Sequence, residues 1–408
     1  MSLPDFRPLS PVPIEPSAFE SFPLSMRRWS VRRTLARLVE RLHRWRLSAL
    51  NTRVLRPYRR DDGQALLAED EGCVVAVGDF GGKTGLSRAA ASEAARLRVR
   101  HPGLILVSLT PPAPGASVQD GRHLRLPVSR LYLLCQPRRL RRALRLFAPE
   151  QLARAHRTGM WAWENDLFPR DWHFALELVD EIWTPSEFSA AAIRSAGALP
   201  VHVVPHHVEV DPHLTAADRA AFGVPPDAFL GLAIMDIKVC PERKNPWAHV
   251  KAWQQAFGDC PNHVLLIKLR CSEATRIVER ELHEMVGGAG NVRLVRQDFS
   301  DRQQAQFQRM ADVYLSLHRA EAYGLNIREF LEMQVPVVAT HWSANTEYGP
   351  AFAHYHGVDS RLIRYRDWMR HYPDHDFSWA DADTAHAARL LRQVAARKPA
   401  IVNTAETA

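Results

Sequence analysis

The chain has 408 residues, of which 46% are hydrophobic and 9% aromatic, so it is long and apolar enough for two hydrophobic cores and is not a disordered protein. Its formal net charge is +8, and its five cysteines are scattered without a CxxC pair, which excludes a disulfide framework and a cysteine zinc site and indicates a reducing compartment. No apolar run reaches the roughly 18 residues of a membrane span. The first residues also lack the pattern of a signal peptide, so we expect a cytoplasmic protein.

The positive charge is concentrated in residues 26–60. Twelve arginines face the single acid Glu40 there, a local net charge of +11 that leaves −3 for the rest of the chain. Apolar residues recur at helical spacing between 35 and 45 with arginines on the other side, which predicts a basic amphipathic helix. Such a helix suits the anionic inner face of a membrane as a peripheral anchor, but its apolar stripe fits equally well against the protein's own core.

A second arginine cluster, PRRLRRALRLF at 137–147, shows a similar amphipathic pattern. Proteins that bind nucleic acid are also rich in arginine, but they combine this charge with aromatic side chains that stack on bases or with a recognisable binding module. The sequence contains neither signature, so we expect no nucleic-acid partner.

Past residue 60, short apolar runs alternate with stretches of helical periodicity. The predicted strands are residues 73–80, 104–110, 181–186, 201–206, 229–236, 263–269, 292–297, 312–318 and 335–340. The predicted helices include residues 87–100, 171–180, 246–257, 275–286 and 325–334. Several strands are apolar throughout, which is typical of parallel strands covered on both faces. The pattern predicts an α/β protein with doubly wound sheets.

The chain divides into a basic N-terminal arm (1–60), a first Rossmann-like domain (61–207) and a second one (208–383). The seam is placed at 208–227, because this stretch is rich in turn residues and has no strand pattern.

The segment HRAEAYGLNIREFLEMQVPVVAT, residues 318–340, runs from a strand through a loop into a helix. Ligands bind at the carboxyl ends of the strands in doubly wound sheets, so Glu321 lies in the ligand-binding loop and Gly324 allows a close turn. Glu329 follows near the first turn of the helix, whose free amides at Leu325 and Asn326 favour an anion. A ligand that carries both phosphate groups and many hydroxyl groups, such as a sugar nucleotide, fits this pattern. The alternative is that the glutamates only complement the helix dipole.

A second segment, MDIKVCPERKNPWAHVKAWQQAF at 235–257, carries Lys238, Arg243 and Lys244 in the loop between a strand and a helix. Cations at the carboxyl end of a strand neutralise a diphosphate leaving group well. Lys268 ends the next predicted strand and adds charge at the same edge, although a lysine in this position is more often only solvated.

These segments resemble the retaining glycosyltransferases of the GT-B fold, of the large family four. Glu321 and Glu329 match the two glutamates of that family's E-x7-E motif, and EAYGLNIREFLEMQVPVVAT resembles the segment that contains it. The resemblance implies two Rossmann-like domains that face each other across a crevice. FSWADADTAHAARLL resembles the family's closing helical segment, and we expect the helix at 384–398 to complete the first domain.

The resemblance also implies roles for residues on the donor side. Glu321 holds hydroxyls of the transferred sugar, Glu329 holds the ribose, and Lys244 with Arg243 binds the diphosphate. Val239 stands where the family has an arginine, so Lys238 or Arg243 takes that role.

On the acceptor side, GDFGGKTGLSRAA at 78–90 resembles the glycine-rich loop of the first domain, in which Gly81, Gly82 and Gly85 allow close backbone approach. WAWENDLFPRDW resembles a segment of a polysaccharide-building branch of the family and supplies Glu164 as an acceptor candidate. A partly buried aromatic ledge explains that segment equally well.

The resulting expectation is an enzyme that moves a sugar, with retention, from a nucleotide-sugar donor to a glycan or lipid-linked oligosaccharide in bacterial-type surface polysaccharide synthesis. We expect no cofactor and no metal ion, because lysine, arginine and backbone amides neutralise the diphosphate. The alternatives are a GT-B sugar-nucleotide epimerase or phosphorylase, a catalytically silent GT-B scaffold, and a non-catalytic basic binding protein.

Overall fold

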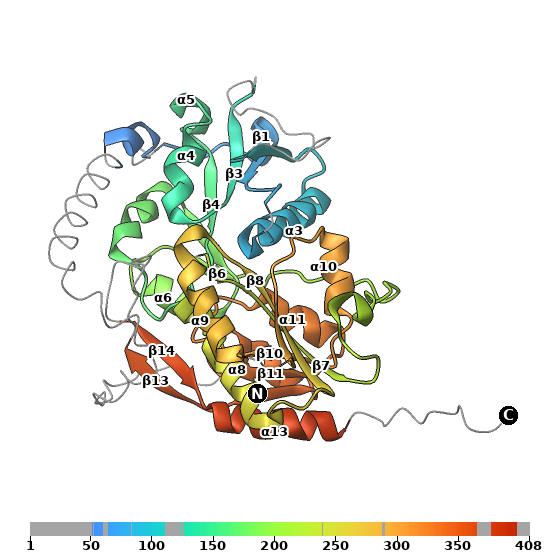
Figure 1. Cartoon of the computed structure of the whole chain (residues 1–408). Coiled ribbons are helices and arrows are strands. Elements are labelled where there is room, and N and C mark those ends of the chain that lie inside the picture. The colour runs from blue at the N-terminus through green and yellow to red at the C-terminus, as the bar shows by residue number, and fades with distance from the viewer. Residues whose placement is uncertain are drawn as a thin grey trace.

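The computed structural model describes most of the chain after residue 50. The described residues are 51, 53–59, 64–82, 84–110, 124, 126–238, 240–287, 290–364 and 377–397. The amphipathic helix predicted near residues 35–45 lies outside them. The described elements form two lobes, each built on a six-stranded sheet, and Figure 1 shows the N-terminal lobe above the C-terminal lobe.

The sheet of the N-terminal lobe has the strand order β2-β1-β3-β4-β5-β6, and all neighbouring strands are parallel. Its strands are β1 (Cys73–Gly78), β2 (Ile105–Ser108), β3 (Val128–Leu134), β4 (His156–Met160), β5 (Glu181–Thr184) and β6 (Val201–Val203). Helix α3 (Gly85–Arg100) supplies apolar residues to one face. The other face is covered by α4 (Leu140–Leu144), α5 (Pro149–Leu152) and α6 (Glu187–Arg194).

Two strands of this sheet, β3 and β4, are missing from the predicted set. β4 reads HRTGM and contains no apolar run. Its Arg157 is nevertheless only 3% exposed, because the guanidinium donates to the carbonyl oxygens of Tyr58 (2.5 Å) and Leu152 (2.7 Å). Backbone acceptors outside the strand, one of them 99 positions away, thus allow a polar sequence to form an inner strand.

The sheet of the C-terminal lobe has the order β12-β11-β10-β7-β8-β9 and is also parallel. Its strands are β7 (Phe229–Asp236), β8 (His263–Arg270), β9 (Val292–Val295), β10 (Val313–Ser316), β11 (Val337–Thr340) and β12 (Tyr355–Val358). Helices α8 (Pro246–Phe257) and α9 (Arg276–Val286) pack on one face, and α10 (Asp301–Gln308) and α11 (Leu325–Glu332) on the other. The predicted α/β class with two doubly wound sheets is confirmed.

The end of the described chain corrects one prediction. Helix α13 (Thr384–Ala396) packs along α8 and places Ala387, Leu391 and Val394 in the core of the C-terminal lobe, so it does not complete the N-terminal domain. The preceding hairpin does so instead. It consists of β13 (Ser360–Arg364) and β14 (Ser378–Ala382), and the indole of Trp379 is buried in the N-terminal core, where its Nε1 donates to Asn165 Oδ1 at 2.8 Å.

A second correction concerns the end of the basic arm. Leu55 and Tyr58 are 2% and 7% exposed and belong to the core of the N-terminal lobe. The Tyr58 hydroxyl donates to the carbonyl oxygen of Phe147 at 3.0 Å. Residues 53–59 therefore pack on the protein itself rather than belonging to a separate arm.

Candidate active site

A cavity of about 710 Å³ opens between the two lobes, at the carboxyl ends of their strands. Most of the predicted site residues line it: Lys238, Arg243, Lys244, Lys268, Glu321, Gly324, Leu325, Asn326 and Glu329 from the C-terminal lobe, and Gly85 and Glu164 from the N-terminal lobe. Gly81 and Gly82, although described, do not belong to this lining.

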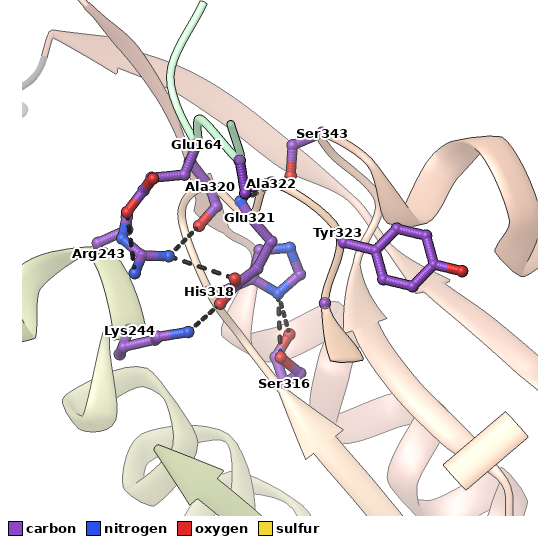
Figure 2. A network of polar contacts seen from close by, with 12 residues as sticks. Glu164, Arg243, Lys244, Ser316, His318, Ala320, Glu321, Ala322, Tyr323 and Ser343 are labelled. Atoms are coloured by element: carbon purple, nitrogen blue, oxygen red, sulfur yellow. Dashed lines mark hydrogen bonds and ion pairs between the residues drawn. The ribbon is translucent and has the colours of Figure 1, made fainter. Parts of the chain in front are cut away.

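The centre of the cavity contains a compact charged cluster of Glu321, Lys244 and Arg243 (Figure 2). Glu321 lies in the loop after β10, and both cations come from α7 (Pro241–Lys244), the short helix after β7. Lys244 Nζ donates to Glu321 Oε1, and Arg243 Nη1 lies 3.3 Å from Glu321 Oε2. The Glu321 backbone amide is fixed by donation to Ser343 Oγ at 2.9 Å. Residues far apart in sequence thus meet because β7 and β10 are neighbours in the sheet.

The two cations keep Glu321 ionised. Burial by itself raises the pKa of a carboxyl group, but the charges of Lys244 and Arg243 outweigh this effect and lower the pKa of Glu321 from 4.5 to about 2. Glu321 is therefore a carboxylate at neutral pH and accepts hydrogen bonds only.

Arg243 connects this cluster to the N-terminal lobe. Its Nη2 lies 3.3 Å from Glu164 Oε1, and its Nη1 donates to the carbonyl oxygen of Ala320 at 2.9 Å (Figure 2). Glu164 follows β4, so one guanidinium bridges a carboxylate from each lobe. The structure brings Glu164 to the edge of the cluster.

The turn before α11 has the geometry that the sequence predicts for Gly324. Its φ of +83° and ψ of 58° lie in the left-handed region, which favours glycine. A Cβ at this position would stand 3.1 Å from both Ile327 Cδ1 and Tyr348 Oη. Tyr348 holds the turn by donating to the carbonyl oxygen of Tyr323 at 2.6 Å. The first helical residues, Leu325 and Asn326, consequently begin at the cavity.

Glu329 is 5% exposed and already has partners on both oxygens. Arg88 of α3 forms an ion pair with Oε1, and Gln308 Nε2 donates to Oε2 at 2.7 Å. Burial lowers the pKa of the Arg88 guanidinium. Arg88 was not among the predicted site residues, although it stands in the glycine-rich stretch at 78–90, one turn after Gly85. No sequence pattern predicts Gln308 as a site residue.

The remaining basic candidates differ in exposure. Lys268 on β8 is 5% exposed and its Nζ lies 4.9 Å from the centre of the Phe299 ring, so it is not the solvated lysine that strand ends usually carry. Lys238 is exposed, and its backbone amide donates to Asp236 Oδ1 at 3.0 Å.

The glycine-rich loop of the N-terminal lobe contributes at one position. Gly85 begins α3, and a Cβ there would lie 3.7 Å from Leu325 Cδ1 of the opposite lobe. Gly82 has an internal reason for being glycine, because its Cβ would lie 2.3 Å from Ser87 Oγ and 2.9 Å from Asp79 Oδ2.

Two buried histidines support the cluster, and the sequence pattern did not predict either of them as a site residue. His249 Nδ1 donates to the carbonyl oxygen of Asn245 at 2.9 Å, and its Nε2 accepts from the Leu317 amide at 3.0 Å. Burial lowers its pKa to about 4. His318, three residues before Glu321, lies 3.0 Å from Asn345 Oδ1 through Nε2, and burial lowers its pKa as well. Both rings are therefore neutral at physiological pH.

Within the described ranges, no group of three or more His, Cys, Asp and Glu side chains is arranged to hold a metal ion. None of the described helices is long and apolar enough to span a bilayer.

No protein-family model matches the sequence, and no curated protein matches it. Among solved structures, HepE from Anabaena in complex with UDP and glucose is similar with a TM-score of 0.55 at 14% identity, over 79% of this chain and 89% of that chain. The UDP-glucose complex of HepE gives a TM-score of 0.51 at 15% identity, over 68% and 82%. A glycosyltransferase from Rickettsia africae gives 0.56 at 12% identity, over 79% and 88%.

The chain has the GT-B fold. The predicted fold, with two lobes facing across a crevice, is thereby confirmed. At these identities the likeness concerns the GT-B fold alone, so membership of family four and the residue roles stay predictions.

Proposed function

We propose that the protein is a retaining glycosyltransferase that moves a hexose from a nucleotide sugar to a glycan or lipid-linked oligosaccharide. The observation that carries the proposal is the contact of Lys244 with Glu321 in the same crevice as the left-handed turn at Gly324. A cation for phosphate, a carboxylate for hydroxyls and free amides at a helix start are thus available to one ligand. A nucleotide sugar uses all three.

On the donor side, Lys244 and Arg243 bind the diphosphate together with the amides of Leu325 and Asn326. Of the two candidates for the role of the family's arginine we assign Arg243, because it lies beside Glu321 whereas Lys238 is exposed.

Glu321 accepts hydrogen bonds from the hydroxyls of the transferred sugar, and Glu329 accepts them from the ribose. Glu329 exchanges its contact with Arg88 for the ribose when the donor binds. Lys268 adds positive charge to the same half of the crevice.

The acceptor hydroxyl attacks the anomeric carbon on the face from which the nucleotide departs. The bond between that carbon and the diphosphate oxygen breaks, and the departing oxygen takes the proton of the acceptor. Negative charge grows on the diphosphate in the transition state, where Arg243 and Lys244 stabilise it. These cations make a metal ion or other cofactor unnecessary, and closure of the lobes excludes water.

The acceptor lies against the N-terminal lobe, near Glu164 and the loop that begins α3. Because HepE is described with UDP and with UDP-glucose, UDP-glucose is the first donor to test. We place the enzyme in surface polysaccharide synthesis in the cytoplasm, with the part of the basic arm before residue 53 as a peripheral anchor at the inner face of the membrane.

The test is a thermal-shift panel of UDP, GDP, dTDP and their sugars on the full chain, followed by turnover of the stabilising donor. A ligand that binds the folded state raises its melting temperature. The anomeric configuration of the product, read by NMR, is expected to match the donor, and transfer is expected to persist in EDTA. Inversion, or activity that EDTA removes and manganese restores, contradicts the mechanism.

The rival functions are distinguished by what each one needs for binding or turnover. An epimerase consumes its donor without an acceptor, a phosphorylase needs inorganic phosphate, a catalytically silent scaffold binds but does not turn over, and a basic nucleic-acid binder shifts mixed DNA or RNA in a salt-dependent manner.

A further inference from the structure

The N-terminal wall of the cavity carries an unassigned pair of arginines. β1, β3 and β4 are neighbours in the sheet, so the residues that follow their carboxyl ends lie together (Figure 1). The short 3₁₀ helix η5 (Pro137–Arg139) begins three residues after β3, and both Arg138 and Arg139 line the cavity.

The charge of this pair is not balanced within the wall. Arg139 Nη1 lies 3.6 Å from Asp79 Oδ2, and 44% of the Arg139 side chain is exposed. Asp79 already accepts hydrogen bonds from Thr110 Oγ1 at 2.5 Å and Ser87 Oγ at 3.2 Å. Arg138 is exposed and has no ion pair with any residue that the structure describes. The arginine pair therefore has one carboxylate beside it, that of Asp79, and this carboxylate is already shared.

An aromatic surface lies next to the arginines. The 3₁₀ helix η6 (Arg170–Leu178) packs against η5, and its half-buried Trp172 lines the cavity. Trp172 is held edge-on by Trp163, with ring centroids 4.8 Å apart, and Trp163 is fixed by donation from Nε1 to the carbonyl oxygen of Leu167 at 2.7 Å. A held indole offers an apolar face to the C–H face of a sugar ring.

A buried amide completes this wall. Gln136 is 8% exposed and lines the cavity, and its Nε2 donates to the carbonyl oxygen of Ala162 at 2.5 Å. Its Oε1 has no hydrogen-bond partner among the described residues. Such buried acceptors are rarely left unpaired, and a sugar hydroxyl is the kind of donor that satisfies one.

We propose that the acceptor carries an anionic group, a carboxylate or a phosphate, which binds Arg138 and Arg139 while a sugar ring of the acceptor lies on Trp172. Guanidinium groups bind both anions through paired hydrogen bonds. The contact from Glu164 to Arg243 places the reacting end of this acceptor at the charged cluster. This inference rests on the proposed function, and it adds the chemical class of the acceptor.

The test compares three probes with one hexyl tail: hexyl glucoside, hexyl glucuronide and hexyl diphosphoglucose. Each is titrated by calorimetry into the full chain saturated with UDP. We expect the glucuronide or the diphosphate to bind at least about tenfold more tightly than the neutral glucoside, as one charge-assisted hydrogen bond requires. Which of the two binds more tightly identifies the source of the negative charge.

The double substitution Arg138→Gln with Arg139→Gln should abolish the preference for the charged probe. Arg142→Gln is the matched control, because Arg142 is an exposed arginine of the same cluster that does not line the cavity. It should keep the preference. Equal binding of all three probes, a preference that survives the double substitution, or a preference lost equally in the control overturns the inference.

UDP affinity separates this result from the proposed function. If no nucleotide binds the wild-type chain, the proposed function fails and the acceptor inference fails with it. If UDP binds normally but the probes show no preference, only the acceptor inference fails. If the double substitution weakens the binding of UDP as much as the binding of the charged probe, the two arginines bind the donor and the inference is wrong.

Discussion

Arg88 and Glu329 form an ion pair across the crevice, between α3 of the N-terminal lobe and α11 of the C-terminal lobe. The Glu329 side chain is 7% exposed and that of Arg88 is 38% exposed, so one partner is buried and the other reaches in from the opposite wall. The carboxylate that we assign to the ribose is therefore occupied by the other lobe in this conformation. With that assignment, we expect donor binding and the contact between the lobes to compete for the same carboxylate.

The first prediction follows from that competition. Arg88→Gln should raise the affinity for UDP by about threefold, the strength of a partly exposed ion pair that no longer has to be broken. Glu329→Gln should weaken the binding of UDP by about tenfold, because the ribose hydroxyls lose a charged hydrogen-bond acceptor. In the Glu329→Gln background, Arg88→Gln should have no further effect in calorimetry. A weaker affinity in Arg88→Gln alone would instead place the guanidinium at the phosphates.

The second prediction concerns the charged cluster. Glu321→Gln and Lys244→Met should each reduce glycosyl transfer by at least about a hundredfold, because a preorganised charge is lost from the transition state. Circular dichroism should show an unchanged fold. Glu332→Gln is the control, since Glu332 pairs with Arg328 on α11 and does not line the cavity. Near-normal turnover in either cluster variant would rule out the assigned roles.

The third prediction is a pH dependence of stability. The pKa of Glu321 is lowered from 4.5 to about 2 in the folded protein, so its ion pairs stabilise the fold fully above pH 4.5. That contribution is lost as the pH falls toward 2. The melting temperature of Glu321→Gln should therefore lie furthest below that of the wild type above pH 4.5, and the gap should close toward pH 2. A gap that is constant across this window contradicts the low pKa.

The fourth prediction concerns the backbone at Gly324. Alanine there must adopt a φ of +83° with its Cβ 3.1 Å from Ile327 Cδ1 and Tyr348 Oη. We expect Gly324→Ala to cost about 1–3 kcal/mol of stability and to weaken nucleotide binding, because the turn that positions the first amides of α11 is strained. Gly103→Ala is the control, since its Cβ would have no atom within 4 Å. Denaturant titration and UDP calorimetry measure both effects, and equal behaviour of the two variants would refute the argument.

The fifth prediction concerns the basic arm. Residues 26–50 contain eight of the arginines and one acid, Glu40, and this local charge of +7 should bring the full chain down with anionic liposomes at low salt, since each arginine near such a surface contributes about 1 kcal/mol. A variant that begins at residue 51 keeps Leu55 and Tyr58 in the core and should stay in solution. Sedimentation to the same extent by both would show that the arm does not act as an anchor.

Local pattern in the sequence was sufficient for the class of fold and for the positions of most elements. The apolar run of β10, the loop with Gly324 and the periodic residues of α11 lie within some twenty consecutive positions, so side-chain spacing and one glycine specify them. The same reasoning placed Glu321 and Lys244 at strand ends, because the carboxyl edge of a parallel sheet is a property of the connectivity. It failed for β4, whose buried Arg157 depends on the carbonyl oxygens of Tyr58 and Leu152 outside the strand.

The pairings themselves were decided by the tertiary structure. Lys244 and Glu321 are separated by 77 positions, and Arg88 and Glu329 by 241. No spacing rule connects such residues, because their contact depends on which strands are neighbours and how the lobes face each other. The same holds at the end of the described chain, where α13 and the hairpin before it join different cores. Whether Leu391 packs on α8 and Trp379 on the N-terminal core depends on the shapes of the partner surfaces, and these exist only once both sheets have formed.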